Sequence, residues 1–80
     1  MFITYVLYSE LLNKYYIGHT IDMENRLSRH NKGFVRSTKY GCPWIIVYKE
    51  EYLTKNDAYK RELKIKSYKK GNAFKKLINI

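Results

Sequence analysis

The chain has 80 residues, of which 45% are hydrophobic, and its 16 Lys and Arg exceed its 7 Asp and Glu to give a net charge of +9. This composition predicts one globular domain over residues 1–80 and argues against disorder. The single Cys42 excludes an internal disulfide and a cysteine-based zinc site, and it fits a reducing cytoplasm. We expect neither a signal peptide nor a membrane span, because polar residues interrupt the N-terminal apolar run.

The positive charge is concentrated in two segments. Residues 26–39 contain five basic residues and no acidic one, and residues 54–80 contain nine basic and two acidic residues. Solubility alone rarely requires such an imbalance, so the pattern predicts a polyanionic partner and favours nucleic acid. A membrane surface is disfavoured, because no expected helix pairs a basic face with a broad exposed apolar one.

Two short strands are expected at the start of the chain, Ile3–Tyr8 and Lys14–His19. Both segments are rich in tyrosine and β-branched residues, which favour strands. The five residues between them predict an antiparallel hairpin.

Two tyrosines and a glycine share one face of this expected hairpin. A turn symmetric about residues 10 and 11 would place Tyr5 directly across from Tyr16. Side chains alternate along a strand, so Gly18 would lie on the same face. Two phenols beside a glycine, which lets another group approach closely, indicate a candidate site.

A helix is expected from Met23 to Asn31 or Lys32, ended by a glycine. Arg26 and His30 are four residues apart, so they would lie along one edge of its apolar stripe. Ordinary surface positions are the alternative for both residues.

The next segment, residues 34–43, is expected to be a loop. It carries Arg36, Lys39 and Tyr40 together with two hydroxyl side chains. Such residues suit a loop that binds phosphates and stacks on a base. The sequence does not distinguish this role from that of a plain connecting loop.

A third strand is expected over Trp44–Leu53, with a first half covered on both faces because it is continuously apolar. Lys49, Glu50 and Glu51 would mark a solvent-exposed end. A last helix, opening at Gly71, would dock through Ala73, Phe74, Leu77 and Ile78.

Between the third strand and the last helix, a helix capped by Thr54 is expected from Lys55 to about Lys66. Glu62 would lie in its apolar face, between Ala58 and Ile65 on one side and Tyr59 and Leu63 on the other. A carboxylate there is costly unless it is paired or coordinated. Pairing with Lys66 and binding of a divalent cation are both open explanations.

Two tripeptides of the expected hairpin carry a family resemblance. Ile3-Thr4-Tyr5 and Tyr16-Ile17-Gly18, ten residues apart, resemble the paired tripeptides of the GIY-YIG nucleases. The second matches to the letter, and the first retains its tyrosine. The order of elements is similar throughout, which implies an α+β fold with a small three-stranded antiparallel sheet flanked by helices. The chain most resembles small single-domain bacterial members related to the N-terminal domain of the excision-repair nuclease.

The resemblance also implies site residues. The family's arginine lies ten residues after the second tyrosine, as Arg26 does, and its frequent histidine lies four further on, as His30 does. Its metal-binding glutamate lies on the helix after the third strand, as Glu62 does. The implied set is Tyr5, Tyr16, Arg26 and His30 for catalysis, Glu62 for one Mg²⁺ or Mn²⁺, and Ile17 and Gly18 as motif backbone. The family's C-terminal asparagine has two candidates, Asn72 and Asn79.

These residues predict a metal-dependent endonuclease acting on DNA, in repair or recombination. Tyr5 is the candidate base, with a pKa that a nearby metal and guanidinium would lower. Tyr16 would orient water or phosphate, Arg26 would neutralise phosphate oxygens, and His30 would hydrogen-bond the phenol or relay a proton. All of these residues, with Glu62, are expected on one concave patch.

Contacts with nucleic acid would be made mainly to backbone phosphates. They are expected from Arg29, Lys32, Arg36, Lys39, Tyr40 and Lys66. Two alternatives remain, a non-catalytic nucleic-acid-binding module and a protein–protein adaptor with a degenerate site. Glu62 separates the first of them from an enzyme, because binding alone needs no buried carboxylate. The oligomeric state stays open between a monomer and a weak dimer.

Overall fold

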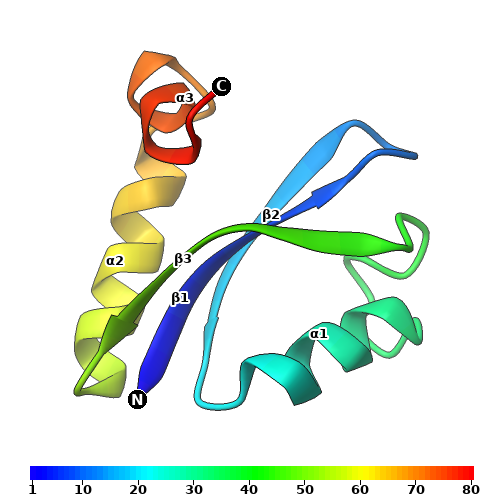
Figure 1. The fold of residues 1–80 in the computed structure, drawn as a ribbon, viewed down its shortest axis with the longest axis horizontal. Coiled ribbons are helices and arrows are strands. Elements are labelled where there is room, and N and C mark those ends of the chain that lie inside the picture. The colour runs from blue at the N-terminus through cyan, green and yellow to red at the C-terminus, as the bar shows by residue number, and fades with distance from the viewer.

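The computed structural model describes all residues from Met1 to Ile80, as a three-stranded antiparallel sheet flanked by three helices (Figure 1). The elements in chain order are β1 (Phe2–Ser9), β2 (Lys14–Thr20), α1 (Met23–Asn31), β3 (Trp44–Tyr52), α2 (Lys55–Ser67) and α3 (Asn72–Ile78). The strand order is β2-β1-β3, so β1 is the central strand. The expected α+β fold is confirmed, with each expected element present.

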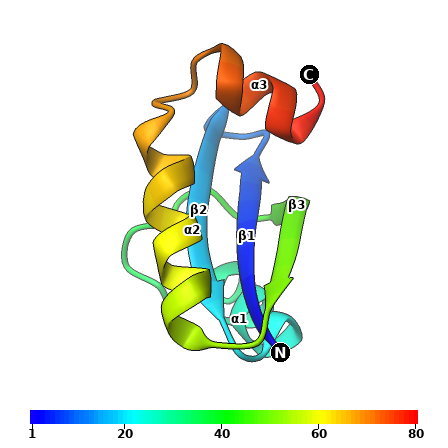
Figure 2. The same ribbon diagram turned by 90° about the vertical axis from the view of Figure 1, so that its left-hand side faces the viewer.

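The sheet is covered on both faces, by α1 on one side and by α2 and α3 on the other (Figures 1 and 2). Alternation along β1 divides its apolar side chains between two small cores. Tyr5 and Leu7 pack with Met23 and Trp44 on the α1 side. On the other side the buried core consists of Val6, Ile65, Phe74 and Ile78. The two faces of β1 therefore hold separate packing environments.

The hairpin register differs by two residues from the expected symmetric one. Tyr5 pairs with Gly18, and Tyr16 lies opposite Leu7. The prediction of Tyr5 directly across from Tyr16 was therefore wrong. A shift of two residues preserves the alternation of side chains, so Tyr5 and Tyr16 still share a face.

The turn explains this register. The last pair of the hairpin is Ser9 with Lys14, which leaves a four-residue turn. Asn13 completes the turn in the left-handed region, with a φ of 50°, a conformation that asparagine tolerates better than most residues. The Ser9 hydroxyl donates to the carbonyl of Gly41 at 2.6 Å and so holds the end of β1 in place.

β3 is an edge strand, and the prediction that its first half is covered on both faces was wrong. Trp44 is buried, but Ile45 and Ile46 are 55% and 37% exposed. In the strand order β2-β1-β3, this strand has a neighbour on one side only.

Glu50 is not simply part of an exposed strand end. Its carboxylate accepts hydrogen bonds from the hydroxyls of Tyr48 and Tyr52. Arg61 of α2 donates to both carboxylate oxygens, at 2.9 and 3.1 Å. Burial raises the pKa of Glu50, but these hydrogen bonds and the charge of Arg61 outweigh it, so the pKa is lowered. The cluster ties α2 to β3.

The buried face of α2 is narrower than expected. Ala58, Glu62 and Ile65 are buried, whereas Tyr59 and Leu63 are 45% and 47% exposed. Thr4 of β1 donates to the carbonyl of Ala58 at 2.8 Å, which holds this small residue against the sheet. In α3, Phe74 and Ile78 are buried and Leu77 is partly buried, but Ala73 is exposed.

Candidate active site

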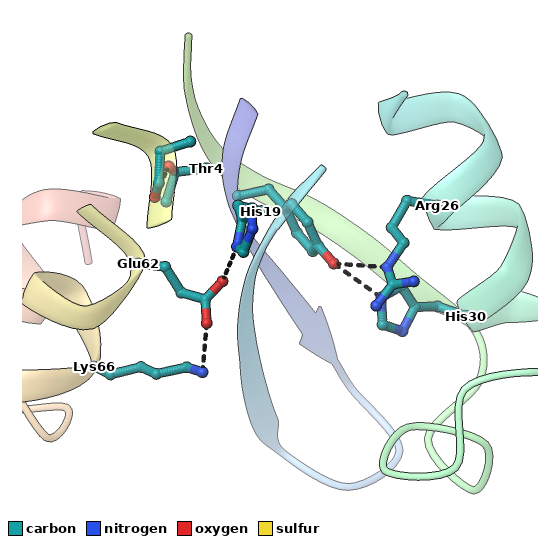
Figure 3. Close-up of polar contacts among 8 residues, drawn as sticks. Thr4, His19, Arg26, His30, Glu62 and Lys66 are labelled. Atoms are coloured by element: carbon teal, nitrogen blue, oxygen red, sulfur yellow. Dashed lines mark hydrogen bonds and ion pairs between the residues drawn. The ribbon is translucent and has the colours of Figure 1, made fainter. Parts of the chain in front are cut away.

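Tyr5 extends its hydroxyl from the sheet to α1. The side chain is fully buried. Its Oη lies 3.1 Å from Nε2 of His30, and Nε of Arg26 donates to it at 3.4 Å (Figure 3). A guanidinium only donates, so the phenol oxygen accepts from Arg26 and directs its own hydrogen toward His30.

The other ring nitrogen of His30 fixes its tautomer. Nδ1 lies 2.7 Å from Oγ1 of Thr38, whose hydroxyl donates to the carbonyl of Val35 at 3.3 Å. Nδ1 is therefore assigned the hydrogen and donates to Thr38, which leaves Nε2 as the acceptor for Tyr5. Burial, followed by the charges of Arg26 and Arg29, lowers the pKa of His30 to about 4. His30 is neutral at pH 7.

Acidification is expected to destabilise the fold through His30. Its pKa falls from an ordinary 6.5 to about 4 on folding, so between these values the unfolded chain binds more protons and stability falls as the pH falls. At about 1.4 kcal/mol per pKa unit, the loss is about 3 kcal/mol. Urea unfolding at a series of pH values measures it. His30→Gln should show a shallower pH dependence over this window, and an unchanged dependence would contradict the assignment.

Tyr5 itself is a protonated phenol at neutral pH. Burial raises its pKa to about 12, and the hydrogen bond and charge of Arg26 lower it by too little to compensate. This is the reverse of the direction expected from the guanidinium. Tyr16 is only partly buried, with its ring centroid 6.4 Å from that of Tyr5 and 4.8 Å from that of His30. It is the phenol of the pair that solvent can reach.

Gly18 makes room for the Tyr5 ring. A Cβ atom at this position would lie 2.6 Å from Oη and 2.8 Å from Cζ of Tyr5, and 3.2 Å from Cε1 of Tyr16. The glycine of the second tripeptide is therefore a packing requirement of both phenols. Ile17, which precedes it, packs on the opposite face with the α2–α3 core.

Gly18→Ala is expected to destabilise the chain by about 1–3 kcal/mol, the usual cost of overpacking a core. The tyrosine ring must move, which also breaks its contact with His30. Chemical denaturation measures the loss. Gly71→Ala is the control, because Gly71 is exposed at the start of α3, has an ordinary φ of −79°, and would bring a Cβ only to 3.3 Å from the nearest atom, the carbonyl oxygen of Tyr68. Equal effects of the two substitutions would contradict the close packing of Gly18.

Glu62 lies on the α2 side of the sheet, next to His19 of β2, whereas Arg26 and His30 lie on the α1 side (Figure 3). Its Oε1 accepts from Nδ1 of His19 at 2.6 Å, and its Oε2 accepts from Nζ of Lys66 at 2.7 Å. The pairing with Lys66, one of the two explanations that the sequence leaves open, is therefore present. The four other candidate residues gather on the α1 side, where Tyr5 and His30 are fully buried. The expectation that these four residues and Glu62 lie on one concave patch was therefore wrong.

Sequence reasoning missed His19 and Thr38. His19 follows Gly18 and so faces the α2 layer, where the buried carboxylate of Glu62 needs a donor. That alternation, combined with the expected burial of Glu62, was a usable signal for His19. Thr38 lies in a loop, where no periodicity predicts its contact with His30.

The residues around Glu62 fit a metal site in which the protein supplies a single carboxylate. No group of three or more His, Cys, Asp and Glu side chains is placed to hold an ion. Mg²⁺, however, usually keeps several waters and is bound by one or two carboxylates plus substrate phosphates. Each oxygen of Glu62 has a second lone pair, and the Lys66 side chain is 49% exposed and can turn toward solvent.

Most of the predicted nucleic-acid contacts lie around the end of α1 and the loop after it. The exposed side chains there are Arg29, Lys32, Arg36, Lys39 and Tyr40. The loop is anchored, since Nε1 of Trp44 donates to the carbonyl of Thr38 at 2.8 Å. Lys66 lies apart from these residues, on α2.

The two candidate asparagines, Asn72 and Asn79, begin and cap α3, which lies over the hairpin end of the sheet (Figure 2). Both are exposed, and neither forms a hydrogen bond with Tyr5, Arg26, His30 or Glu62. None of the three helices has the length and apolar composition needed to cross a membrane.

Comparison with known proteins places this architecture in a family. The chain is similar to a UPF0213 protein of Staphylococcus aureus strain Mu3, with 43% identity over 54 residues, and this match spans 66% of either chain, just under two thirds. It is also similar to a UPF0213 protein of Staphylococcus haemolyticus, with 34% identity over 64 residues that cover 79% of this chain and 78% of the relative. No solved structure matches. Residues 1–76 match the GIY-YIG catalytic domain, so this chain belongs to the GIY-YIG family of nuclease domains.

Proposed function

We propose that this chain is a divalent-metal-dependent endonuclease that hydrolyses phosphodiester bonds in DNA, with a role in repair or recombination. The observation that carries the proposal is the setting of Arg26. Its Nε is engaged by the buried Tyr5, which leaves its two terminal nitrogens to bind phosphate oxygens as a fork. The contact with Tyr5 raises the pKa of Arg26, so the guanidinium stays charged.

In this proposal Arg26 stabilises the charge that develops on the phosphate. Preorganised donors of this kind are usually the largest single contribution to such a reaction. Tyr5 and His30 are positioning residues, because both are fully buried and hold Arg26 and the Tyr16 ring in place. Tyr16, the solvent-accessible phenol, orients the attacking water.

Glu62 would hold the cation, with His19 fixing the orientation of its carboxylate. A bound cation would polarise the phosphate and help the leaving oxygen to depart. Lys66 competes for the same carboxylate, so in this account it turns outward toward the DNA backbone when the cation binds.

A non-catalytic nucleic-acid-binding module is the second candidate. The observation that favours it is that both oxygens of Glu62 already accept hydrogen bonds, from His19 and Lys66. In that case the carboxylate would need no cation, and nucleic-acid binding alone would account for the positive charge of the chain.

The test is a panel of end-labelled DNA structures of matched length: duplex, nicked, branched and single-stranded. Each is incubated with the protein in Mg²⁺, in Mn²⁺ and in chelator, and both binding and cleavage are measured. The proposal predicts cation-dependent cleavage of at least one structure. Binding of the panel without cleavage in either cation would instead support the binding module.

DNA affinity is expected to fall steeply with salt, because the basic side chains displace counterions. The slope of log affinity against log salt should be about −0.9 for each phosphate contacted in duplex DNA. Replacing both Arg36 and Lys39 by alanine should make this slope shallower and weaken binding uniformly across sequences. Titrations by fluorescence anisotropy at several salt concentrations measure this, and an affinity that barely responds to salt would reject backbone binding.

A further inference from the structure

Two adjoining hollows share His19 and Lys55. The smaller, of about 360 Å³, has Arg26 among its lining residues. The larger, of about 540 Å³, is lined by His19, Lys55, Asn56 and Tyr59. Of these, only His19 has a part in the proposed reaction, and it acts through Glu62. Its volume is within the range of ligand pockets, which is about 300–1,000 Å³.

Lys55 has no evident structural purpose. It is the first residue of α2, where the helix dipole disfavours a positive charge. The end of the helix is already capped by Thr54, whose Oγ1 accepts from the amide of Asp57 at 3.1 Å. Lys55 forms no ion pair in the structure. It does share the smaller hollow with Arg26, so two cations from different helices face one space suited to an anion.

Tyr59 supplies an aromatic surface to the larger hollow. The side chain is 45% exposed, and its ring centroid lies 5.5 Å from that of His19. Nδ1 of His19 is in turn held by Glu62 at 2.6 Å, so the histidine backs the tyrosine from a fixed position. The amide of Asn56, which both donates and accepts hydrogen bonds, lies in the same hollow.

We propose that the larger hollow is a nucleotide subsite that takes one unpaired base of the DNA, next to a phosphate held by Arg26 and Lys55. The base stacks on Tyr59, and the Asn56 amide hydrogen-bonds to its edge. In a continuous duplex the faces of each base are covered by its neighbours, so this subsite selects single-stranded or frayed DNA. The inference rests on the proposed function, in that DNA is the ligand.

The test measures binding in chelator, so that no cleavage interferes. The probe is a short oligonucleotide carrying one 2-aminopurine, either single-stranded or annealed to its complement. The single strand is expected to bind with quenching of the 2-aminopurine fluorescence. Base–aromatic stacking is lost in Tyr59→Ala, so affinity for the single strand should fall by about 5- to 150-fold, with little change for the duplex.

Three further variants control the experiment. Tyr59→Phe keeps the ring and should retain quenching and affinity. Tyr59→Leu keeps the apolar bulk without the ring and should show the same loss of affinity for the single strand that is expected of Tyr59→Ala. The leucine variant keeps the test valid if the alanine variant folds poorly. Leu63→Ala removes a side chain of similar exposure, 47%, one turn along α2 and should have no effect. Lys55→Gln should weaken binding of the single strand.

Two results would overturn the subsite. One is an equal affinity of Tyr59→Leu and the unmodified protein for the single strand, and the other is an equal loss for the single strand and the duplex. Failure of the subsite can be distinguished from failure of the nuclease proposal. A protein that cleaves DNA but is indifferent to Tyr59 retains the nuclease function without this subsite. A protein that never cleaves but binds single strands through Tyr59 retains the subsite in a binding module.

Discussion

Arg26→Lys is expected to lower the single-turnover rate of DNA cleavage by about 10²–10³-fold, the usual cost of removing a preorganised donor from a developing anion. Lysine keeps the positive charge but has no planar fork. It cannot donate to Tyr5 through Nε and to a phosphate through two further nitrogens at once. DNA binding in chelator should change little, because the charge is retained.

The matched control is Arg29→Lys, at an exposed position of the same helix one turn further on. Lysine keeps the charge with which Arg29 would contact a backbone phosphate, so this substitution should leave the cleavage rate unchanged. If the two substitutions had the same effect on the rate, the contact of Arg26 with Tyr5 would have no part in catalysis and Arg26 would be only one of several surface cations.

Glu62→Ala is expected to lower the rate of cation-dependent cleavage by about 10²–10⁴-fold, while DNA binding stays nearly intact. Binding of the cation lowers the barrier by several kcal/mol and contributes less to formation of the complex. The substitution should not unfold the chain, because the partly exposed Lys66 can turn to solvent once its partner is removed. Cleavage rates and thermal unfolding are measured on the same samples.

Glu51→Ala, at an exposed glutamate of β3, controls for the removal of a negative charge. If Glu62 instead only balances His19 and Lys66, its alanine variant would melt at a lower temperature, and cleavage would persist in proportion to the folded protein. A destabilised variant with full activity would make Glu62 a structural residue and remove the main argument for a metal site.

Much of the fold follows from local sequence signals. Asp22 and Thr54 each accept a hydrogen bond from the backbone amide three residues on, so α1 and α2 both begin directly after a capping residue. Gly33 adopts a φ of 77° after α1, as expected of a glycine that ends a helix. These signals involve neighbours in the chain, and for that reason they can be read without the structure.

Other features depend on tertiary contacts. The hairpin register depends partly on Ser9, which donates to Gly41 32 residues away. The pKa of Tyr5 is raised because the fold buries the phenol, an effect that outweighs the neighbouring Arg26. Similarly, the spacing of Arg26 and His30 predicts their shared edge on α1, but Thr38, which orients the histidine ring, comes from a loop.

The position of Glu62 depends partly on local sequence signals and partly on tertiary contacts. Its burial on α2 follows from the apolar pattern around it, and its pairing with Lys66 follows from a separation of four residues. Its placement on the α2 side, away from Tyr5, depends on how the helix packs against β2. That the α1 side and the α2 side of the sheet both contribute residues to the site therefore cannot be predicted from the sequence alone.

The most direct test of metal-dependent DNA cleavage is the nicking of supercoiled plasmid as a function of Mg²⁺ or Mn²⁺ concentration, followed by the appearance of open circles. If cleavage depends on a cation held by Glu62, nicking rises to saturation with either cation, stops when chelator is added, and is missing in a parallel preparation of Glu62→Ala. Plasmid that the protein binds but leaves supercoiled at every cation concentration, or nicking that proceeds equally well in chelator, would contradict it.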